Sequence, residues 1–277
     1  MEKVTLKNGW KLPVLCVGTN RMDAVKMQTV MKGALEAGFV FFDSARDYGN
    51  EPVVGEVLSQ LMNKLNINRS DVFITTKVGN TQQVKRDMAH EIDLSLKNLR
   101  TDYVDIWFLH WPYPDYYEDN LMQMYQLREQ GKARAIGLAN PRVRHLQRLV
   151  DLGMPLPDVI QIEHHPFRIS QDILDFCKKH QIQVEAYSPL CFMIEKIREN
   201  EVLKNIAVEH GKSLGQIVLR WHYQHQVIPV FRSEKPSRFN ENADIFDFEL
   251  NSEEMQMINA LDEDFKFIPE SLHCPGY

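Results

Sequence analysis

Eight short apolar segments alternate with stretches of helical spacing along the 277 residues, and this alternation constrains the fold more than any other feature. Continuous apolar runs of strand length are typical of parallel strands that are buried on both faces. The runs lie at residues 13–18, 39–43, 72–77, 104–109, 133–139, 159–163, 183–187 and 227–230. The helical patterns lie at residues 24–38, 51–65, 82–99, 121–130, 143–152, 172–180, 201–210, 214–225 and 252–261.

Eight strand–helix units predict an α/β fold of the closed (β/α)8 TIM-barrel type. The competing architecture is an open, doubly wound sheet that binds dinucleotides through a G-x-G-x-x-G turn. The chain contains no G-x-G at all, which favours the barrel. Its length suits one barrel of roughly 250 residues. Because no Pro/Gly/Ser-rich linker interrupts the pattern, we expect a single domain over residues 1–277.

The segment before the first barrel strand predicts a β-hairpin. Residues 4–12 place Asn8-Gly9 between two short strand-like stretches, and this dipeptide favours the tight turn of a hairpin. We expect the hairpin to close the bottom of the barrel.

Composition excludes several classes of protein. The net charge is −6 and there is no dense basic run, so we expect no nucleic-acid partner. No apolar run approaches the roughly 20 residues of a membrane span, and the N-terminus lacks a signal-peptide core. The four cysteines form no C-x-x-C pair, and the adjacent His164 and His165 make a poor ligand pair. We therefore expect a cytoplasmic protein without a metal site or a disulfide framework.

Polar residues follow three consecutive strands at their carboxyl ends, where the chemistry of barrels takes place. They are Asp43 with the nearby Tyr48, then Lys77, and then His110. Each residue type is ordinary at such a position, but their joint occurrence indicates an active site. A buried ammonium at Lys77 needs a partner such as Asp43, and it would lower the pKa of a neighbouring phenol.

These groups suit carbonyl reduction. Tyr48 would donate a proton, while His110 would orient the carbonyl beside it. The groups would together stabilise the alkoxide that forms as hydride arrives. Because no side chain supplies hydride, the chemistry requires a cofactor.

The motifs around these residues resemble the aldo-keto reductase family across essentially the whole chain. The segments that carry the resemblance, in family order, are Phe42-Asp43-Ser44-Ala45-Arg46-Asp47-Tyr48-Gly49-Asn50-Glu51, Ile74-Thr75-Thr76-Lys77, and Asp102-Tyr103-Val104-Asp105 through Leu109-His110-Trp111-Pro112. The resemblance implies a monomer that reduces a small aldehyde or ketone with NADPH, with Asp43, Tyr48, Lys77 and His110 as catalytic residues.

The resemblance also implies a cofactor site on the later strands. Asn140 and Gln161 would bind the nicotinamide amide, and Tyr187 would stack on its ring. The residue that precedes Asn140 is Ala139, where the family usually has Ser, so one hydrogen bond is lost. The remaining residues implied for the cofactor are Thr19, Ser188 and Leu190, with Arg232, Arg238, Glu241 and Asn242 around the adenosine end.

The adenosine end departs from the family pattern. The family usually has Lys-Ser after Ile-Pro, to hold the 2′-phosphate of NADPH, and this chain has Val230-Phe231. Arg232 or Lys235 can supply the missing charge. We expect NADPH as the cofactor, with NADH or dual use as the open alternative.

The substrate side is less specific. Asn20 stands where the family often has an aromatic residue, which would make one wall more polar, and Trp111 is a second candidate for substrate binding. Further candidates, which equally suit packing on the rim, are Tyr113, Tyr116, Tyr117 and Phe192. The tail at residues 265–277 borders the substrate in the family. The natural substrate and the direction of reaction stay open.

Two other functions remain open from the sequence. The altered adenosine end is compatible with a redox sensor or partner subunit that binds the cofactor without turnover. A lyase or aldolase that uses Lys77 as a Schiff base is the third hypothesis.

Overall fold

The computed structural model describes residues 1–269 and 273–274. Within them, eight parallel strands close into a barrel in which each strand pairs with the next along the chain and the last pairs with the first. This confirms the predicted (β/α)8 fold. The strands are β3 (Cys16–Gly18), β4 (Phe41–Asp43), β5 (Phe73–Val78), β6 (Val104–Leu109), β7 (Ala133–Ala139), β8 (Val159–Glu163), β9 (Gln183–Tyr187) and β10 (Val227–Phe231).

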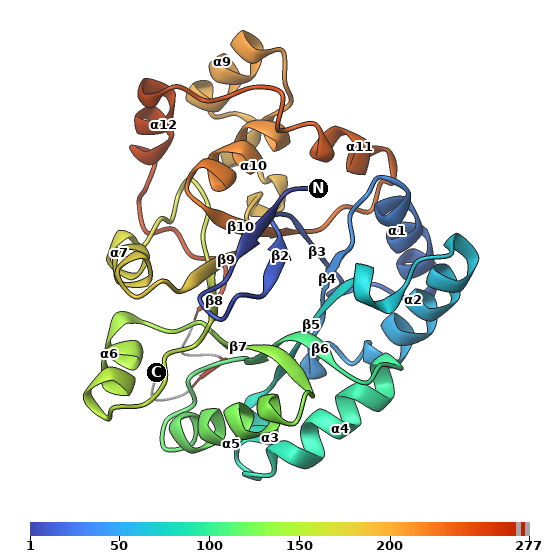
Figure 1. The fold of residues 1–277 in the computed structure, drawn as a ribbon. Coiled ribbons are helices and arrows are strands. Elements are labelled where there is room, and N and C mark those ends of the chain that lie inside the picture. Colours follow the sequence, from blue (N-terminus) through green and yellow to red (C-terminus); the bar gives the residue numbers. More distant parts are fainter. Residues whose placement is uncertain (270–272, 275–277) are drawn as a thin grey trace.

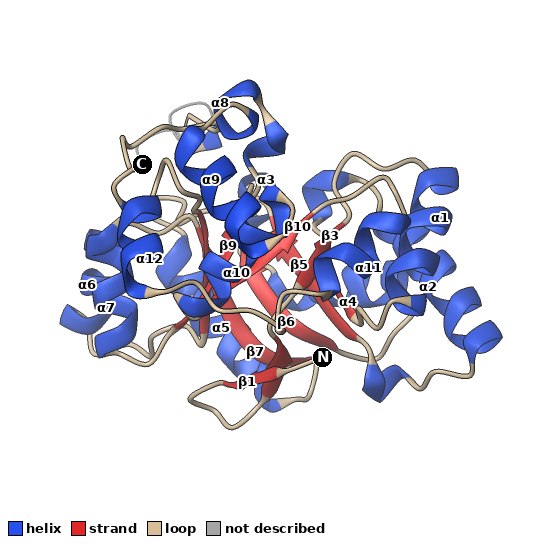
Figure 2. Ribbon diagram, turned by 90° about the horizontal axis from the view of Figure 1, so that it is seen from above, coloured by secondary structure: helices blue, strands red, loops and turns tan. Residues whose placement is uncertain are grey.

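Helices surround the strands on all sides, as Figures 1 and 2 show. Polar side chains cap several of them: the Ser213 hydroxyl accepts from the Gln216 amide, for example, and starts one helix. The helices are α1 (Ala24–Glu36), α2 (Glu51–Leu65), α3 (Asn80–Gln83), α4 (Met88–Leu99), α5 (Tyr117–Glu129), α6 (Val143–Asp151), α7 (Gln171–Lys179), α8 (Glu195–Arg198), α9 (Glu201–His210), α10 (Leu214–Gln224), α11 (Ser237–Ala243) and α12 (Ser252–Asn259). None of these helices, in the part of the chain described, is long and apolar enough to cross a membrane.

The N-terminal hairpin closes one end of the barrel, as predicted. Strands β1 (Lys3–Thr5) and β2 (Lys11–Pro13) pair antiparallel, and Gly9 takes a φ of 85° in the turn. Leu6 and Leu12 are buried against side chains that fill the barrel interior, among them Phe41. Figure 1 looks onto this end, with the hairpin across the centre of the barrel.

Alternation along the strands decides which side chains enter the barrel. Phe41, Phe73 and Ile106 belong to the interior cluster beneath the hairpin, whereas their neighbours Phe42 and Ile74 pack outward in the larger cluster. Residues two or four positions further along the same strands therefore point inward as well. Asp43 and Lys77 are such residues, so their polar side chains enter the barrel at its other end.

Several predicted boundaries were wrong, each for a local reason. The run at residues 13–18 is not one strand, because residues 11–13 pair in the hairpin and the barrel strand starts at Cys16. The helix predicted at 82–99 is two helices. Arg86 takes a φ of 54° between them, and Asp87 then caps α4 by accepting from the His90 amide. The short helices α8 and α11 were not predicted.

Candidate functional site

Asp43, Tyr48, Lys77 and His110 lie together at the carboxyl ends of three neighbouring strands. Asp43 is the last residue of β4, Lys77 is near the end of β5, and His110 directly follows β6. Tyr48 ends a 3₁₀ turn, Arg46–Tyr48, that brings its ring back over the barrel. The structure thus brings all four predicted residues into one site.

Lys77 is fully buried and stands at the centre of the site. Its Nζ lies 2.5 and 2.7 Å from the two carboxylate oxygens of Asp43, and it donates to the Ser44 carbonyl oxygen at 3.0 Å. Burial alone would lower the pKa of Lys77, but Asp43 and Tyr48 together raise it above its ordinary value. Lys77 therefore carries its charge at neutral pH, with Asp43 as the compensating carboxylate.

Tyr48 receives a hydrogen bond from Lys77 Nζ at 3.3 Å. The expectation of a lowered pKa was wrong. Burial raises the pKa of Tyr48 above its ordinary value, and the opposing effect of the Lys77 ammonium is further offset by the Asp43 carboxylate. The phenol consequently holds its proton at neutral pH, which is the state that a proton donor needs.

His110 has a charged neighbour that the sequence did not indicate. Its Nδ1 lies 3.1 Å from Oδ2 of Asp47, and its ring meets the ring of Tyr48 edge-on, with centroids 5.9 Å apart. Burial lowers the pKa of His110, and the hydrogen bond to Asp47 partly opposes this. Asp47 is the residue before Tyr48 in the 3₁₀ turn, and only the path of that turn brings its carboxylate to the ring.

Gln161 links the site to a second buried carboxyl group. Its amide nitrogen donates to Asp43 Oδ1 at 3.1 Å and to Glu185 Oε2 at 2.9 Å. Glu185 is fully buried, and its other oxygen has no hydrogen-bond partner among the described residues. Burial, with a contribution from Asp43, raises the pKa of Glu185 to about 8. Sequence reasoning missed Glu185, although its register opposite Gln161 is a usable signal.

The other residues expected around the nicotinamide lie beside this cluster. Asn140 directly follows β7 and has a φ of 57°, a conformation that Asn tolerates better than most residues. Its Nδ2 donates to the His110 carbonyl oxygen at 3.0 Å, and its Oδ1 accepts from the Tyr187 hydroxyl at 2.8 Å. Thr19 is buried and donates to the Asp43 carbonyl oxygen at 2.8 Å.

The residues expected around the adenosine end lie on and after β9 and β10. Arg232 donates to the Asn20 carbonyl oxygen at 3.1 Å and lies 3.8 Å from the Glu234 carboxylate. Ser188 takes a φ of 52° just after β9, and Leu190 is half-buried. On α11 and just before it, the exposed residues are Lys235, Arg238 and Glu241, while Asn242 is buried.

This set of residues fits a nicotinamide dinucleotide. The Asn140 and Gln161 amides complement a carboxamide, and the half-buried ring of Tyr187 offers a stacking surface beside them. Exposed cationic side chains after β10 complement phosphate groups. The chemistry of these donors therefore suits both ends of such a cofactor.

The candidate substrate residues divide into two groups. Trp111 is buried and stacks on His273 with ring centroids 5.8 Å apart, whereas Asn20 is exposed. The tyrosines pack on the rim or below it: Tyr113 stacks on Tyr116 at 5.5 Å, and Tyr117 is buried in the outer core. Trp111 and Asn20 therefore remain the candidates for contact with a substrate.

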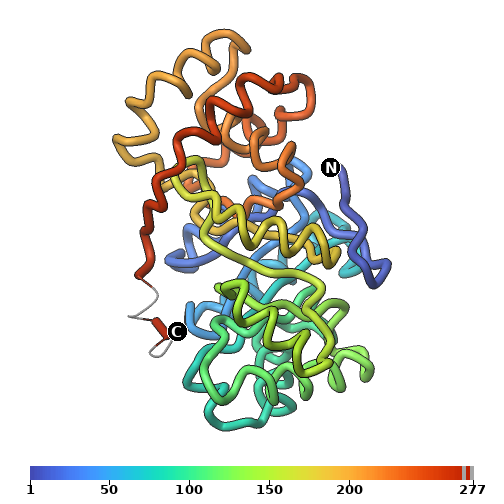
Figure 3. The backbone as a smooth tube through the Cα atoms, turned by 90° about the vertical axis from the view of Figure 1, so that its left-hand side faces the viewer, coloured from blue at the N-terminus to red at the C-terminus, as the bar shows by residue number. Residues whose placement is uncertain are grey.

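The described part of the tail lies across the end of the barrel opposite the hairpin, as Figure 3 shows. Glu163, at the end of β8, accepts from the backbone amides of Phe267 at 2.7 Å and Ile268 at 3.2 Å. Further on, the carbonyl oxygen of His273 accepts from Asn80 at 2.6 Å. Phe192, another candidate, contacts Phe267 with centroids 5.4 Å apart. Of the tail expected beside the substrate, residues 270–272 and 275–277 lie outside the described residues.

His164 and His165 have separate partners. The ring of His164 stacks on Trp221 at 4.9 Å, while His165 Nε2 lies 3.1 Å from Glu163 Oε1. The two side chains therefore have different partners and do not point toward a common site.

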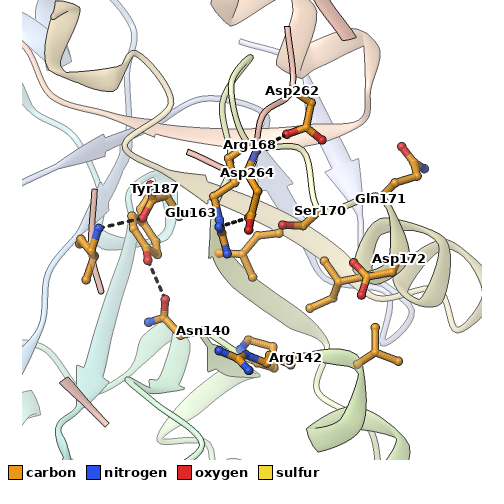
Figure 4. A pocket seen from close by; sticks show the side chains of 15 residues that line it. Asn140, Arg142, Glu163, Arg168, Ser170, Gln171, Asp172, Tyr187, Asp262 and Asp264 are labelled. Atoms are coloured by element: carbon orange, nitrogen blue, oxygen red, sulfur yellow. Dashed lines mark hydrogen bonds and ion pairs between the residues drawn. The ribbon is translucent and has the colours of Figure 1, made fainter. Parts of the chain in front are cut away.

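A cavity of about 360 Å³ adjoins the site on the side of α6 and α7. Figure 4 shows it with Asn140 and Tyr187 on one side and Arg142, Arg168 and Asp172 among its other residues. The catalytic candidates Asp43, Tyr48, Lys77 and His110 are not part of its lining. The cavity therefore adjoins the site through Asn140 and Tyr187.

Comparison with known proteins adds an independent finding. The model of the Aldo/keto reductase family matches residues 5–263. The chain is 38% identical over 269 residues to a glyoxal reductase of Bacillus subtilis (strain 168), covering 97% of this chain and 95% of that protein. It is 34% identical over 269 residues to a methylglyoxal reductase of Escherichia coli (strain K12), covering 96% of each.

Solved structures agree with this. An aldo-keto reductase from a Medee basin deep-sea metagenome library has a TM-score of 0.88 and 35% identity, covering 97% of both chains. A Bombyx mori aldo-keto reductase in complex with NADP has a TM-score of 0.91 and 28% identity, covering 98% of this chain and 95% of that chain.

Proposed function

This chain belongs to the aldo/keto reductase family, and from that premise we propose that it reduces a small aldehyde or ketone to an alcohol with Tyr48 as the proton donor. It is an NADPH-dependent oxidoreductase. The observation that carries the proposed role of Tyr48 is its hydrogen bond from the buried, charged Lys77, at 3.3 Å.

In the proposed mechanism, the cofactor would supply the hydride and the chain would supply the proton. NADPH, when bound, supplies the hydride that adds to the carbonyl carbon. Tyr48 donates its proton to the carbonyl oxygen, so that hydride and proton together complete the alcohol. Lys77 keeps its hydrogen bond to Tyr48 and stabilises the negative charge that develops on the phenol oxygen. Asp43 holds Lys77 in place with both carboxylate oxygens.

The cofactor would lie across the strand ends from β7 to β10. Asn140 and Gln161 would hold the nicotinamide carboxamide, and Tyr187 would stack on its ring. Along the pyrophosphate and at the adenosine end, the residues proposed for binding are Thr19, Ser188, Leu190, Arg232, Arg238, Glu241 and Asn242. Arg232 and Lys235 would supply the positive charge for a 2′-phosphate.

Small carbonyl compounds are the proposed substrates. The relatives named glyoxal reductase and methylglyoxal reductase act on compounds of this size, and Asn20 and Trp111 would border the substrate here. We further propose that the protein acts as a monomer in the cytoplasm.

The test is a Tyr48→Phe variant. We expect the variant to bind NADPH, seen by fluorescence, while its kcat with a panel of aldehydes falls by about 10² to 10⁴, as for loss of a general acid. Parallel assays with NADH show the cofactor preference.

Two outcomes would overturn the proposal. Full turnover by Tyr48→Phe would remove Tyr48 from the mechanism. Binding of NADPH by the unaltered protein with no turnover of any carbonyl would favour a redox sensor instead. A Schiff base on Lys77 is disfavoured by the raised pKa of its ammonium, which keeps the nitrogen protonated beside Asp43.

A further inference from the structure

The 3₁₀ turn that carries Tyr48 begins with Arg46, whose side chain reaches the surrounding helices. Backbone hydrogen bonds shape the turn from within: Tyr48 N, for example, donates to the Ala45 carbonyl oxygen at 3.1 Å. Such bonds do not attach the turn to a strand. The Arg46 side chain makes a contact outside the turn, because its Nη1 lies 3.4 Å from Oε2 of Glu51, the first residue of α2.

Glu51 joins the turn to strand β5. Its Oε1 accepts a hydrogen bond from the Thr76 hydroxyl at 2.6 Å. Thr76 directly precedes Lys77, and because side chains alternate along a strand, Thr76 faces outward where Lys77 faces inward. The turn and β5 therefore meet on two sides: through the Glu51 carboxylate outside the barrel, and through the hydrogen bond between Lys77 and Tyr48 inside it.

Arg46 also compensates the charge of two buried carboxylates. The side chains of Glu51 and Glu91 are each 1% exposed, and Arg46 Nε lies 3.7 Å from Oε2 of Glu91, in the first turn of α4. Glu91 has a second cation nearby in Lys85, which is 61% exposed. Arg46 is the one cationic partner of Glu51 among the described residues. Because a buried charge without a partner is unstable, the position of Glu51 depends on Arg46.

The hydrogen bond on the inner side is already long. Lys77 Nζ lies 3.3 Å from the Tyr48 hydroxyl oxygen, beyond the most common range for such a bond. A further displacement of the turn by about 0.3 Å would take the two atoms out of hydrogen-bond distance. The contact therefore depends on whatever holds the turn against β5.

We propose that Arg46 is a positioning residue, which holds the turn against β5 through Glu51 and so keeps Tyr48 within hydrogen-bond distance of the buried ammonium. Arg46 acts through the phenol and not on the reacting atoms. The inference rests on the proposed reduction and adds a residue on which its rate depends. Because the ammonium stabilises charge that develops on the phenol oxygen in the transition state, a longer distance lowers kcat and leaves cofactor binding intact.

The first experiment replaces Arg46 by glutamine and by lysine. Arg46→Gln removes the charge, and we expect kcat with an aldehyde to fall about tenfold, which corresponds to one weakened hydrogen bond. The Kd for NADPH, measured by fluorescence without substrate, should stay within about twofold. Arg46→Lys keeps a cation that can reach one carboxylate, so it should recover part of kcat.

A double-mutant cycle shows whether Arg46 acts through Glu51. Glu51→Gln retains an oxygen that can accept from Thr76, but it removes the charge that pairs with Arg46. If the two residues act as a pair, the double variant should be no slower than the slower single variant. Two independent tenfold effects would instead multiply to about a hundredfold.

Two further variants separate a loss of stability from a loss of positioning. Adding Glu91→Gln to Arg46→Gln removes one of the buried charges that had lost its partner. This should raise Tm above that of Arg46→Gln, while kcat stays low. As the matched control, Arg69 is 20% exposed and pairs with the buried Asp105 at 3.0 Å, just before the start of β5 and away from the site. Arg69→Gln should lower Tm and leave kcat unchanged.

The outcomes distinguish this inference from the function beneath it. If no aldehyde oxidises NADPH, or if Tyr48→Phe keeps full turnover, the proposed reduction by Tyr48 itself fails. If Tyr48→Phe is slow but Arg46→Gln keeps the kcat of the unaltered protein, the role of Arg46 is overturned. A kcat that returns together with Tm when Glu91→Gln is added would overturn it as well, because Arg46 would then only support the fold. Fully multiplicative effects in the cycle would refute its action through Glu51.

Discussion

Two buried carboxyl groups, Asp43 and Glu185, lie inside the barrel with one buried ammonium, Lys77. Asp43 pairs with Lys77, while Glu185 reaches Asp43 only through the amide of Gln161. With one cation available, the second carboxyl group is more stable when protonated, which agrees with the raised pKa of Glu185. The site therefore keeps a neutral acid next to an ion pair.

Glu185 should make stability depend on pH. Its pKa rises from 4.5 to about 8 on folding, so its contribution to stability is full below pH 4.5 and is lost as pH rises through 8. We expect Glu185→Gln to match the unaltered protein near pH 5 and to exceed its Tm by about 5 °C at pH 8.5. Thermal unfolding at both pH values measures this. An equal Tm difference at the two values would contradict the assignment.

The sequence indicated which site residues lie close together, but not how their surroundings shift their pKa values. The carboxyl ends of three consecutive strands were enough to predict the cluster of Asp43, Lys77 and His110. The direction of the Tyr48 pKa was wrong, because it depends on how deeply the ring is buried against the effect of one ammonium. Asp47 and Glu185 were missed because their contacts arise from a turn and from strand register.

Among the elements, α2 and α4 approach closely at a residue without a side chain. An added Cβ at Gly55 in α2 would lie 2.3 Å from the carbonyl oxygen of Asn98 and 2.6 Å from the backbone carbon of Leu99. Backbone atoms cannot move aside as the end of a flexible side chain can. The helix pair therefore depends on Gly55.

Gly55→Ala should lower the free energy of unfolding by about 2 kcal/mol, as overpacking does. The matched control is Gly215→Ala in α10, where the added Cβ would meet no atom nearer than 3.7 Å. That change should instead stabilise the protein by about 0.5–1 kcal/mol, because alanine is the better helix former. Chemical denaturation of both variants measures the pair, and changes of the same sign would refute the packing argument.

Four strands could be bounded from the sequence because most of each strand is buried and a polar residue directly follows it. The strands at residues 104–109, 133–139, 159–163 and 183–187 have the predicted bounds, and the residues that follow them are His110, Asn140, His164 and Ser188. The split between α3 and α4 depends on the left-handed conformation of Arg86, which no periodicity reveals. Short helices such as α8 have too few residues for a helical pattern to emerge.

In the whole molecule, the apolar cluster beneath the hairpin and the candidate active site lie at opposite ends of the barrel. The hairpin packs on apolar side chains at one end, and polar residues lie at the carboxyl ends of the strands at the other. The sequence predicted this division, because hairpin, strand order and strand-end residues all follow from position along the chain. The path of the tail over the site was expected only from the family, and depends on contacts such as those of Glu163.

A Leu12→Ala variant tests whether packing at the hairpin end is independent of the site at the other end of the barrel. Leu12 is fully buried beneath the barrel interior, so its truncation should cost about 2–5 kcal/mol of unfolding free energy. Its distance from the strand ends should leave the KM values for NADPH and aldehyde within about twofold, a change of under 0.5 kcal/mol. Denaturation and steady-state kinetics on one preparation give both numbers. A large rise in KM would show that the two ends are coupled.

The position of the hairpin has a practical consequence for attaching the protein to a solid support. Met1 is 43% exposed and precedes the hairpin, while Trp111 follows strand β6 at the opposite end of the barrel and stacks on His273. A bead or electrode linked through the first residue would leave the far end facing the liquid, with small molecules free to enter. A link placed beside residue 273 would turn that end toward the solid and hinder their entry.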